Sequence, residues 1–269
     1  MKFFEKESIK LKSKGCGGSK KMVLEVEGLT GGYTRKEIIK DISFQVEAGE
    51  IVGLIGLNGA GKSTTIKHII GLMEAFQGEI KLNGLSIKDN PEAYRKSISF
   101  VPEVPMLYRG LTLKEHLEIT AMAYDLEFET VLENALPLLK QFRLDERMNW
   151  FPEDFSKGMK QKLMITMALI SSPQLLLIDE PFVGLDPIAI MDFEELLIKE
   201  KEKGHSVLLS THMLQNAEKI CDSFVILHKG IVHAKGTVGE LSTELGLEEA
   251  SLEEVYRQLV EKEGFRNDT

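Results

Sequence analysis

The sequence predicts an α/β domain organised around a parallel β-sheet, and three observations support this prediction. Short apolar segments of strand length, among them IVGLIG and QLLLID, alternate along the chain with segments of helical periodicity. These apolar runs lack polar alternation, as expected of parallel strands that are covered on both faces. Residues 111–172 contain segments of helical periodicity, and no strand pattern separates these segments. This predicts a helical subdomain inserted into the α/β core.

The N-terminal elements predict two different sheets. MVLEVEGLTGGY and EIIKDISFQVEAGE read as strands, and GEIKLNG alternates like a half-buried edge strand, so these three should form an antiparallel side sheet. IVGLIG reads as a core strand that runs into a glycine loop and then the helix KSTTIKHIIGL. SISFVP reads as a further core strand that stops at Pro102.

The remaining elements continue the alternation. LTLKEHLEITAMAY, ETVLENALPLLKQF and the stretch after Gly158 are the helices of the insert. PQLLLID returns to a core strand, followed by a helix around 188–203, the strand HSVLLST and a helix around 213–221. SFVILHKGIVHAKG reads as a hairpin that turns at Lys229-Gly230, and two acidic amphipathic helices follow it.

Size, charge and cysteine content narrow the class of protein. The 269 residues are 43% hydrophobic and 28% charged, which is ordinary for a globular protein, and no apolar run reaches the roughly 18–20 residues of a membrane span. A net charge of −9 disfavours nucleic acid as the main partner. Two cysteines do not make a disulfide framework, which fits a reducing cytoplasm.

Shifts in composition predict three segments. Residues 1–21 carry seven Lys against two Glu and read as a basic, disordered extension, although such a segment could also contact an anionic membrane surface. Residues 22–239 form the α/β domain, with its helical subdomain at about 104–172. Residues 240–269 are expected to form an acidic, helical C-terminal segment.

The stretch GLNGAGKST, residues 56–64, fits the phosphate-binding loop (P-loop) pattern G-x-x-x-x-G-K-[ST] in full. Its glycines let backbone N–H groups approach phosphate oxygens, Lys62 reaches the β- and γ-phosphates, and the Ser63 hydroxyl binds Mg²⁺. A merely structural glycine turn would leave the Lys-Ser-Thr order unexplained. The predicted phosphate-binding residues are Gly56, Asn58, Gly59, Ala60, Gly61, Lys62, Ser63 and Thr64.

Two adjacent carboxylates end the apolar strand in LLLIDEP. Asp179 is placed to hold the metal ion, as in the Walker-B arrangement. Glu180, one position further, is placed to polarise a water molecule that attacks the γ-phosphate. The alternative is a helix-capping or surface acid. A GTPase is excluded because no N-K-x-D guanine motif occurs.

A second candidate phosphate site lies at the start of the helix in EDFSKGMKQKLMITMALI. Ser156 and Gly158 come just before its apolar, helix-periodic run, where free backbone N–H groups and the positive end of the helix dipole favour an anion. This site is almost a hundred residues away from the P-loop. The sequence therefore raises the question of how two phosphate sites could hold one nucleotide.

GLNGAGKST, FSKGMKQK, LLLIDEP, GLDP and LLSTH occur in this order, and together they resemble an ABC-type ATP-binding subunit over residues 22–239. The resemblance implies ATP and Mg²⁺ as ligands. It also implies that two subunits face head to tail, so that Ser156 and Gly158 of one contact the γ-phosphate held by the P-loop of the other. A homodimer with two composite sites is therefore expected.

Three further residues take their expected roles from this resemblance. Tyr33 matches the aromatic residue that stacks on adenine, the alternative being a solvent-facing turn residue. His212 matches the switch histidine that contacts the γ-phosphate and orients the water, the alternative being a structural histidine. Asp186 matches the loop that contacts the partner subunit, and it is equally suited to cap the helix after Pro187.

Two motifs depart from the family pattern. Phe155, Lys157 and Met159 replace three residues of the usual L-S-G-G-Q signature, a variant familiar among bacterial members that keeps the phosphate-facing positions. In SFVPEVPMLY, Glu103 replaces a Gln whose carbonyl binds Mg²⁺. Because Glu binds the metal more strongly but adds a negative charge near the phosphate, we expect Glu103 to remain a metal ligand with a steeper Mg²⁺ and pH dependence. The alternative is a solvated loop acid.

TGGYTRKEI, FVPEVPMLY, LTLKEHLEITAMAY and WFPEDFSKGMKQK most resemble ATP-binding subunits of the bacterial Ecs type. This implies an ATPase that powers an exporter through a separate integral membrane subunit, and a cytoplasmic location on the inner face of the membrane. A helix of that subunit would rest against residues 103–117, where Met106, Leu107 and Tyr108 either form the groove or pack the insert.

The alternative function is a soluble ABC ATPase that acts on ribosomes or DNA. Chromosome-type members insert a long coiled coil between P-loop and signature, whereas only 94 positions separate Lys62 from Ser156 here. Translation-type members carry two ATPase domains, and this chain has one. A non-hydrolysing regulatory module is disfavoured because Lys62, Glu180 and His212 are all present.

Overall fold

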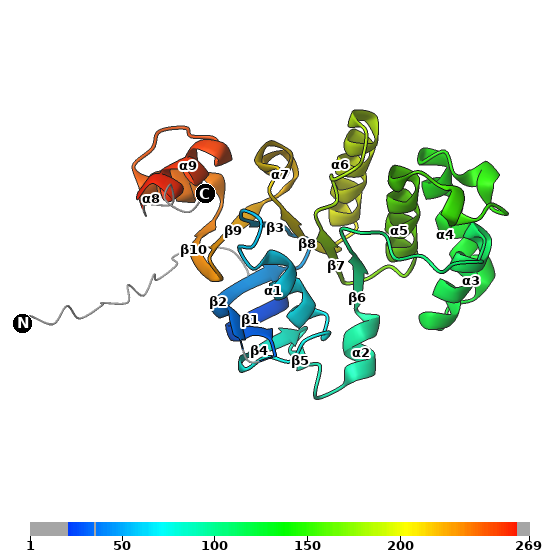
Figure 1. The fold of residues 1–269 in the computed structure, drawn as a ribbon, viewed down its shortest axis with the longest axis horizontal. Coiled ribbons are helices and arrows are strands. Elements are labelled where there is room, and N and C mark those ends of the chain that lie inside the picture. The colour runs from blue at the N-terminus through cyan, green and yellow to red at the C-terminus, as the bar shows by residue number, and fades with distance from the viewer. Residues whose placement is uncertain (1–20, 35, 263–269) are drawn as a thin grey trace, which may run out of the picture.

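A six-stranded sheet forms the centre of the computed structural model, which describes residues 21–34 and 36–262 (Figure 1). In spatial order its strands are β10 (Ile231–Gly236), β9 (Ser223–His228), β3 (Ile51–Ile55), β8 (Ser206–Thr211), β7 (Leu175–Asp179) and β6 (Ile98–Val101). All neighbouring pairs are parallel except β9 and β10, which form an antiparallel hairpin. The predicted parallel α/β core is confirmed.

The antiparallel side sheet is also confirmed. Its order is β2 (Lys36–Glu47), β1 (Met22–Tyr33), β4 (Gln77–Leu82) and β5 (Leu85–Ser86). The expectation that β4 is the edge strand is wrong, because the two-residue β5 pairs with its end. A strand this short has no periodicity for the sequence to show.

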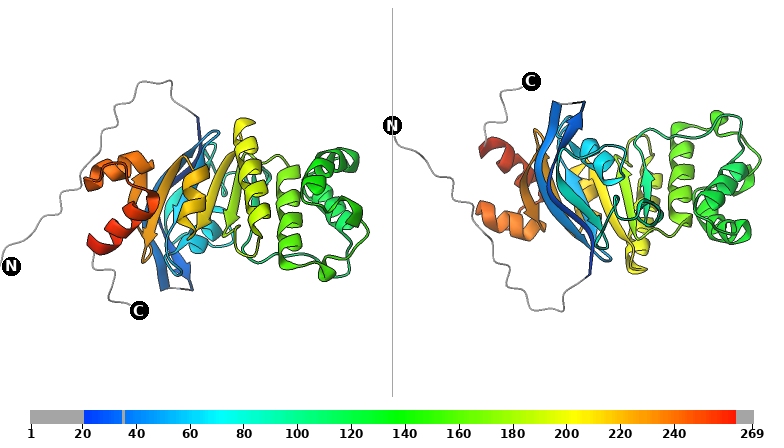
Figure 2. Two further views of the ribbon diagram at one scale, coloured as in Figure 1. Left: turned by 90° about the horizontal axis from the view of Figure 1, so that it is seen from above. Right: turned by 90° about the horizontal axis from the view of Figure 1, so that it is seen from below.

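The helices lie on the faces and at both ends of these sheets. Helices α3 (Leu113–Ala123), α4 (Phe128–Gln141) and α5 (Lys157–Ile170) form a block at one end, the inserted helical subdomain, with short 3₁₀ turns η1 (Asp145–Arg147) and η2 (Pro152–Asp154) (Figure 2). At the opposite end lie α8 (Val238–Leu245) and α9 (Leu252–Lys262). The others are α1 (Lys62–Ile69), α2 (Pro91–Lys96), α6 (Pro187–Glu202) and α7 (Leu214–Ile220).

Alternate residues of the core strands face two separate hydrophobic clusters. In β7, Leu176 belongs to the cluster that includes the insert and α6, whereas Leu177 belongs to the cluster that includes α1 and the side sheet. In β8, Leu209 belongs to the first of these clusters and Leu208 to the second. Because both faces are buried, these strands need apolar side chains at every position, which explains their continuous aliphatic sequence.

The acidic C-terminal helices pack on the domain that precedes them. Leu241 of α8 and Leu252 of α9 are buried in a third cluster with Ile55 and Phe224 from the central sheet. Thr237 begins α8 with a capping box, its hydroxyl accepting from Glu240 N while the Glu240 carboxylate accepts from Thr237 N. The acidic side chains therefore lie on the outer face of helices whose apolar face is covered.

The basic segment 1–21 lies outside the described residues apart from Lys21. Among helices of the described ranges 21–34 and 36–262, none combines the length and the apolar character that a membrane crossing requires.

Candidate active site

The P-loop connects the end of β3 to the start of α1, at the edge where the parallel strands end. Gly59 and Gly61 have φ angles of 82° and 105°, in the left-handed region that favours glycine. A Cβ on Gly61 would also come within 2.7 Å of Ile39 Cγ2. Gly61 is the N-cap of α1 and supplies no side-chain cap, so the first N–H groups of the helix remain available to an anion.

A pocket of ≈ 440 Å³ opens over this loop, within the size range of small-molecule sites. It gathers residues from four distant parts of the sequence. Its lining consists of Tyr33, Ile38, the loop and helix start 57–64, Glu103 and Glu180. The structure therefore brings the predicted adenine, phosphate, metal and water-polarising residues around one cavity.

Lys62 is buried and already paired. Its Nζ donates to Gly56 O at 2.7 Å and lies 3.1 Å from Glu180 Oε1, with side-chain exposures of 5% and 8% for the two residues. The Lys62 ammonium group is thus held beside the first residue of the P-loop, in the lining of the pocket. A triphosphate entering the pocket would compete with Glu180 for this cation.

Glu180 stands between Lys62 and His212. Its Oε2 lies 2.9 Å from His212 Nδ1, and its backbone N donates to Ser210 O at 3.0 Å. The backbone of Glu180 has a φ of 48°, a left-handed conformation that costs a residue with a Cβ about 1 kcal/mol. The side chain of His212 is 44% exposed and lies beside Glu180, but it does not itself line the P-loop pocket.

Ser210 links the Asp179 carboxylate to the Glu180 backbone, and it is not among the predicted site residues. It lies opposite Asp179 in the parallel pairing of β7 with β8. The Ser210 hydroxyl donates to Asp179 Oδ1. The oxygen of that hydroxyl, Ser210 Oγ, also accepts from Glu180 N at 3.3 Å. Its place two residues before His212, at the end of a core strand, is the sequence signal that could have identified it.

The predicted metal ligands fit magnesium. Ser63 and Glu103 line the pocket, and Asp179 ends the strand beside Glu180, so the set offers one hydroxyl and two carboxylates. Hard oxygen ligands of this kind suit Mg²⁺, which uses one or two carboxylates together with phosphate oxygens rather than a full protein cage. Among residues 21–34 and 36–262, no group of three or more His, Cys, Asp or Glu side chains is placed to hold a metal ion.

Tyr33 lies at the rim of the pocket with 50% of its surface exposed. Lys67 Nζ lies 3.1 Å from its hydroxyl and 5.6 Å from the ring centroid. The hydrogen bond with Lys67 is the main cause that lowers the pKa of Tyr33. Since the ring remains half exposed, it keeps surface on which a base could stack.

Ser156, Gly158 and Asp186 do not line the P-loop pocket. Ser156 caps α5, its Oγ accepting from Met159 N at 3.3 Å, and an added Cβ on Gly158 would meet Gly184 O at 3.2 Å. The second candidate phosphate site therefore adjoins the segment before Asp186, and it is separate from the first within one chain.

Asp186 caps α6 as the sequence suggested. Its carboxylate accepts from Ala189 N at 3.0 Å, and this hydrogen bond is the main cause that lowers its pKa. A depressed carboxylate pKa stabilises the fold above the unfolded-state pKa, and this contribution is lost as the pH falls through the folded-state pKa.

We expect Asp186→Ala to lower Tm by about 2–4 °C at pH 7, because α6 loses its cap, and by less near pH 3. Asp186→Asn keeps an amide oxygen that can accept from Ala189 N, so it should preserve most of the stability and flatten its pH dependence. Melting curves of the three proteins between pH 3 and 7 measure this. Equal melting temperatures for wild type and Asp186→Ala at pH 7 would contradict the capping role.

A parallel α/β core with a P-loop, two strand-end carboxylates and a histidine beside them defines a nucleotide-binding domain of the P-loop class. The "ABC transporter" family model matches residues 39–183, and the chain belongs to this family.

Similar proteins agree with this assignment. The "ABC-type transporter ATP-binding protein EcsA" of Bacillus subtilis (strain 168) is 54% identical over 241 residues, 90% of this chain and 98% of that protein. The "Nod factor export ATP-binding protein I" of Rhizobium meliloti (strain 1021) is 35% identical over 82% of this chain and 66% of its own length. A solved "ATP binding subunit of ABC transporter" superposes with a TM-score of 0.85 at 53% identity, covering 88% of this chain and 99% of that one.

Proposed function

We propose that this chain binds and hydrolyses ATP to power an ABC exporter. The observation that best supports the proposal is the Lys62–Glu180–His212 arrangement at the P-loop, in which the buried Lys62 and Glu180 lie 3.1 Å apart and the partly exposed His212 lies 2.9 Å from Glu180. Backbone N–H groups of the P-loop and Lys62 bind the phosphates, and the Glu180 carboxylate takes up the proton of the attacking water. His212 orients Glu180 and contacts the γ-phosphate. A bound Mg²⁺ neutralises charge on the phosphates.

Glu103 is the proposed metal ligand that departs from the family pattern. It lines the same pocket as Ser63 and Glu180, so its carboxylate adds a negative charge to the site. We expect Glu103→Gln to weaken the apparent Mg²⁺ affinity by about tenfold, because an amide oxygen brings no negative charge to the cation. Titrating hydrolysis with Mg²⁺ measures this effect. An unchanged Mg²⁺ profile would show that Glu103 is a solvated loop acid.

Two copies of the chain are proposed to complete each ATP site. Ser156 and Gly158 lie outside the P-loop pocket of their own chain. A second copy, placed head to tail, would present its α5 start to the γ-phosphate, which closes the dimer. Hydrolysis removes those contacts and the dimer opens. Size-exclusion chromatography of the Glu180→Gln variant with and without ATP tests this, and a monomer under both conditions would contradict it.

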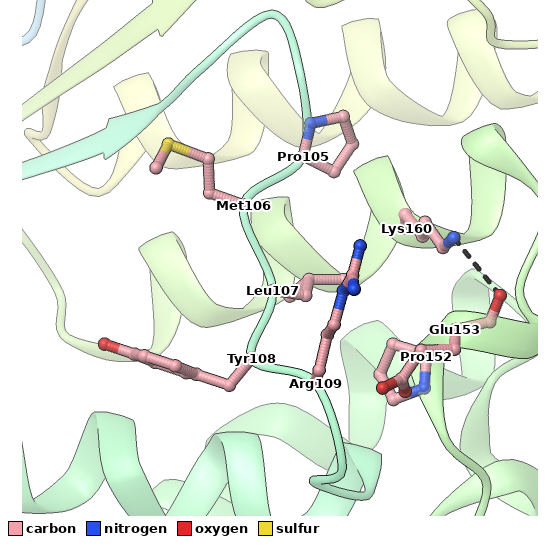
Figure 3. Close-up of a pocket in the computed structure, with 8 residues that line it drawn as sticks. All are labelled: Pro105, Met106, Leu107, Tyr108, Arg109, Pro152, Glu153 and Lys160. Atoms are coloured by element: carbon pink, nitrogen blue, oxygen red, sulfur yellow. Dashed lines mark hydrogen bonds between the residues drawn. The ribbon is translucent and has the colours of Figure 1, made fainter.

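The docking site proposed for the membrane subunit is a groove of ≈ 570 Å³ beside the insert, the pocket shown in Figure 3. Met106 and Tyr108 are 75% and 61% exposed, whereas Leu107 packs against the hydrophobic core. The sequence leaves groove and core roles open: Leu107 packs the core, and Met106 and Tyr108 are the residues proposed to form the groove. Buried His116 holds this loop in place, because its Nε2 accepts from Tyr108 N at 2.9 Å and its Nδ1 donates to Thr112 O at 2.8 Å. Exposed apolar side chains beside a charged rim suit a short amphipathic helix.

Affinity purification from detergent-solubilised cells distinguishes the exporter from the alternative, a soluble ATPase on ribosomes or DNA. We expect a multi-span membrane protein in stoichiometric yield, which would place the chain on the inner face of the membrane. Met106→Asp should reduce that yield, whereas Met122→Asp, at an equally exposed position outside the groove, should not. Recovery of ribosomes or DNA-bound proteins instead would contradict the exporter.

A further inference from the structure

The docking groove of Figure 3 lies beside the segment that leads into α5, and hydrogen bonds join the two. Gly110, which follows the groove residues 105–109, donates from its N to Glu153 Oε1 at 2.7 Å. Gly110 has a φ of 75°, so a backbone turn that favours glycine presents this N–H. Two backbone hydrogen bonds join the same segments further on, from Leu113 N to Trp150 O at 3.0 Å and from Lys114 N to Met148 O at 2.9 Å. Of these three contacts, the one at Glu153 depends on a side chain.

Glu153 is also joined to α5 itself. It belongs to the turn η2, and Phe155, which follows the turn, is 4% exposed in the core of the insert. Ser156, the next residue, caps α5. The Glu153 carbonyl accepts from Lys160 Nζ, in the first turn of α5, at 3.3 Å (Figure 3). Glu153 is therefore bonded through its carboxylate to the groove loop, and through its carbonyl to the helix that Ser156 caps.

The Glu153 carboxylate is charged where it meets the loop. The hydrogen bond from Gly110 N is the main cause that lowers the pKa of Glu153. Hydrogen bonds to an ionised acceptor are shorter and stronger than those between neutral groups, which fits the distance of 2.7 Å. Glu153 does not line the P-loop pocket, so any effect on ATP has to pass through the elements to which it is bonded.

We propose that Glu153 is a positioning residue that transmits occupation of the docking groove to Ser156. A helix that enters the groove displaces the loop 105–110, and the Glu153 carboxylate carries this displacement to the start of α5. Because Ser156 is the residue proposed to meet the γ-phosphate held by a second copy, a docked membrane subunit alters how readily two copies close around ATP. This inference rests on the proposed function, which supplies both the docked helix and the composite ATP site.

A bulky thiol label can stand in for the docked helix. In a chain with Cys16→Ser and Cys221→Ala, fluorescein maleimide is attached at Met106→Cys, a groove position whose native side chain is 75% exposed. Met122→Cys, at a position that is 77% exposed outside the groove, carries the control label. Glu180→Gln is added so that ATP is not consumed, and analytical ultracentrifugation measures ATP-driven dimerisation.

We expect the label at position 106 to raise the ATP concentration needed for half-maximal dimerisation about fivefold, a usual size for coupling between two sites. The label at position 122 should leave this concentration unchanged. Glu153→Ala removes the acceptor and should abolish the effect of the label at position 106. Glu153→Gln keeps an oxygen that can accept from Gly110 N, so it should retain most of the effect.

Glu240→Ala is the matched control for the loss of the acceptor. Like Glu153, Glu240 is exposed and accepts from a backbone N–H, that of Thr237 at 2.8 Å, but it lies on α8. This variant should therefore retain the full effect of the label at position 106. An equal label effect with Glu153 and with Glu153→Ala would overturn the proposal, as would a label at position 106 that changes nothing.

Hydrogen exchange separates a failure of this proposal from a failure of the proposed function. Met159 N donates to Ser156 Oγ at 3.3 Å, so the exchange of its amide reports on the start of α5 without ATP. The label at position 106 should speed this exchange, and Glu153→Ala should abolish the acceleration. If the unlabelled chain does not dimerise with ATP, the proposed function fails, and the exchange rates still decide whether Glu153 joins the groove to α5.

Discussion

Glu180→Gln should lower kcat for ATP hydrolysis by about 10²- to 10⁴-fold while ATP binding is retained or becomes tighter. An amide cannot take up the proton of the attacking water. It also carries no charge, so Lys62 loses the carboxylate that lies 3.1 Å from its Nζ and becomes available to the phosphates. Steady-state hydrolysis and calorimetric ATP binding separate these two effects.

The chain contains a matched control for this substitution. Glu200 is 4% exposed and, like Glu180, has a lysine and a histidine as partners, with Lys203 Nζ at 2.6 Å and His205 Nδ1 at 2.7 Å. It lies on α6, away from the P-loop pocket. Glu200→Gln should therefore leave kcat unchanged even if Tm falls. A Glu180→Gln variant that hydrolyses ATP within threefold of wild type would remove Glu180 from the proposed mechanism.

Lys62→Ala should weaken ATP binding by about 10- to 100-fold, because a charge-assisted contact to phosphate contributes about 1.5–3 kcal/mol. It should also lower the free energy of unfolding by about 3 kcal/mol, since the buried Glu180 carboxylate loses its cation. Calorimetry measures the first effect and urea unfolding the second.

A double-mutant cycle isolates the Lys62–Glu180 interaction from other effects of the substitution. In the Glu180→Gln background no buried charge remains to be left unpaired, so Lys62→Ala should destabilise the fold much less. Lys203→Ala serves as the comparison, because Lys203 is 63% exposed and pairs with Glu200 near solvent. Identical losses from Lys62→Ala in both backgrounds would show that the pair does not contribute to stability.

Much of the fold could be predicted because its strands and helices are long enough to show a period. The buried strands show unbroken apolar runs, and the insert shows helical periodicity over its whole length. Helix α2 escaped prediction because it has six residues, of which Tyr94 alone is buried, although Asn90 and Pro91 are good helix-start residues. Strand β5 has two residues, too few to show the alternating pattern by which a strand is recognised in a sequence.

The candidate site was predictable in its residue types but not in all its contacts. Local motifs identify Lys62, Glu180 and His212, because each motif is a short pattern with a chemical purpose. The role of Ser210 depends on which strands lie side by side, because Ser210 lies opposite Asp179 in the pairing of β8 with β7. Such pairings are set by tertiary packing, which a single sequence does not display.

The left-handed backbone at Glu180 has a consequence for attempts to evolve this protein in the laboratory. Gly adopts a φ of 48° without the penalty that a Cβ brings, and Asn adopts it more readily than Glu. A selection for heat tolerance should nevertheless keep Glu at this position, because Gly or Asn would leave the buried Lys62 ammonium without its carboxylate at a cost of about 3 kcal/mol, more than the strain that it relieves. Gly or Asn should rise at position 180 only in selections where Lys62 is replaced as well, and such chains would hydrolyse little ATP.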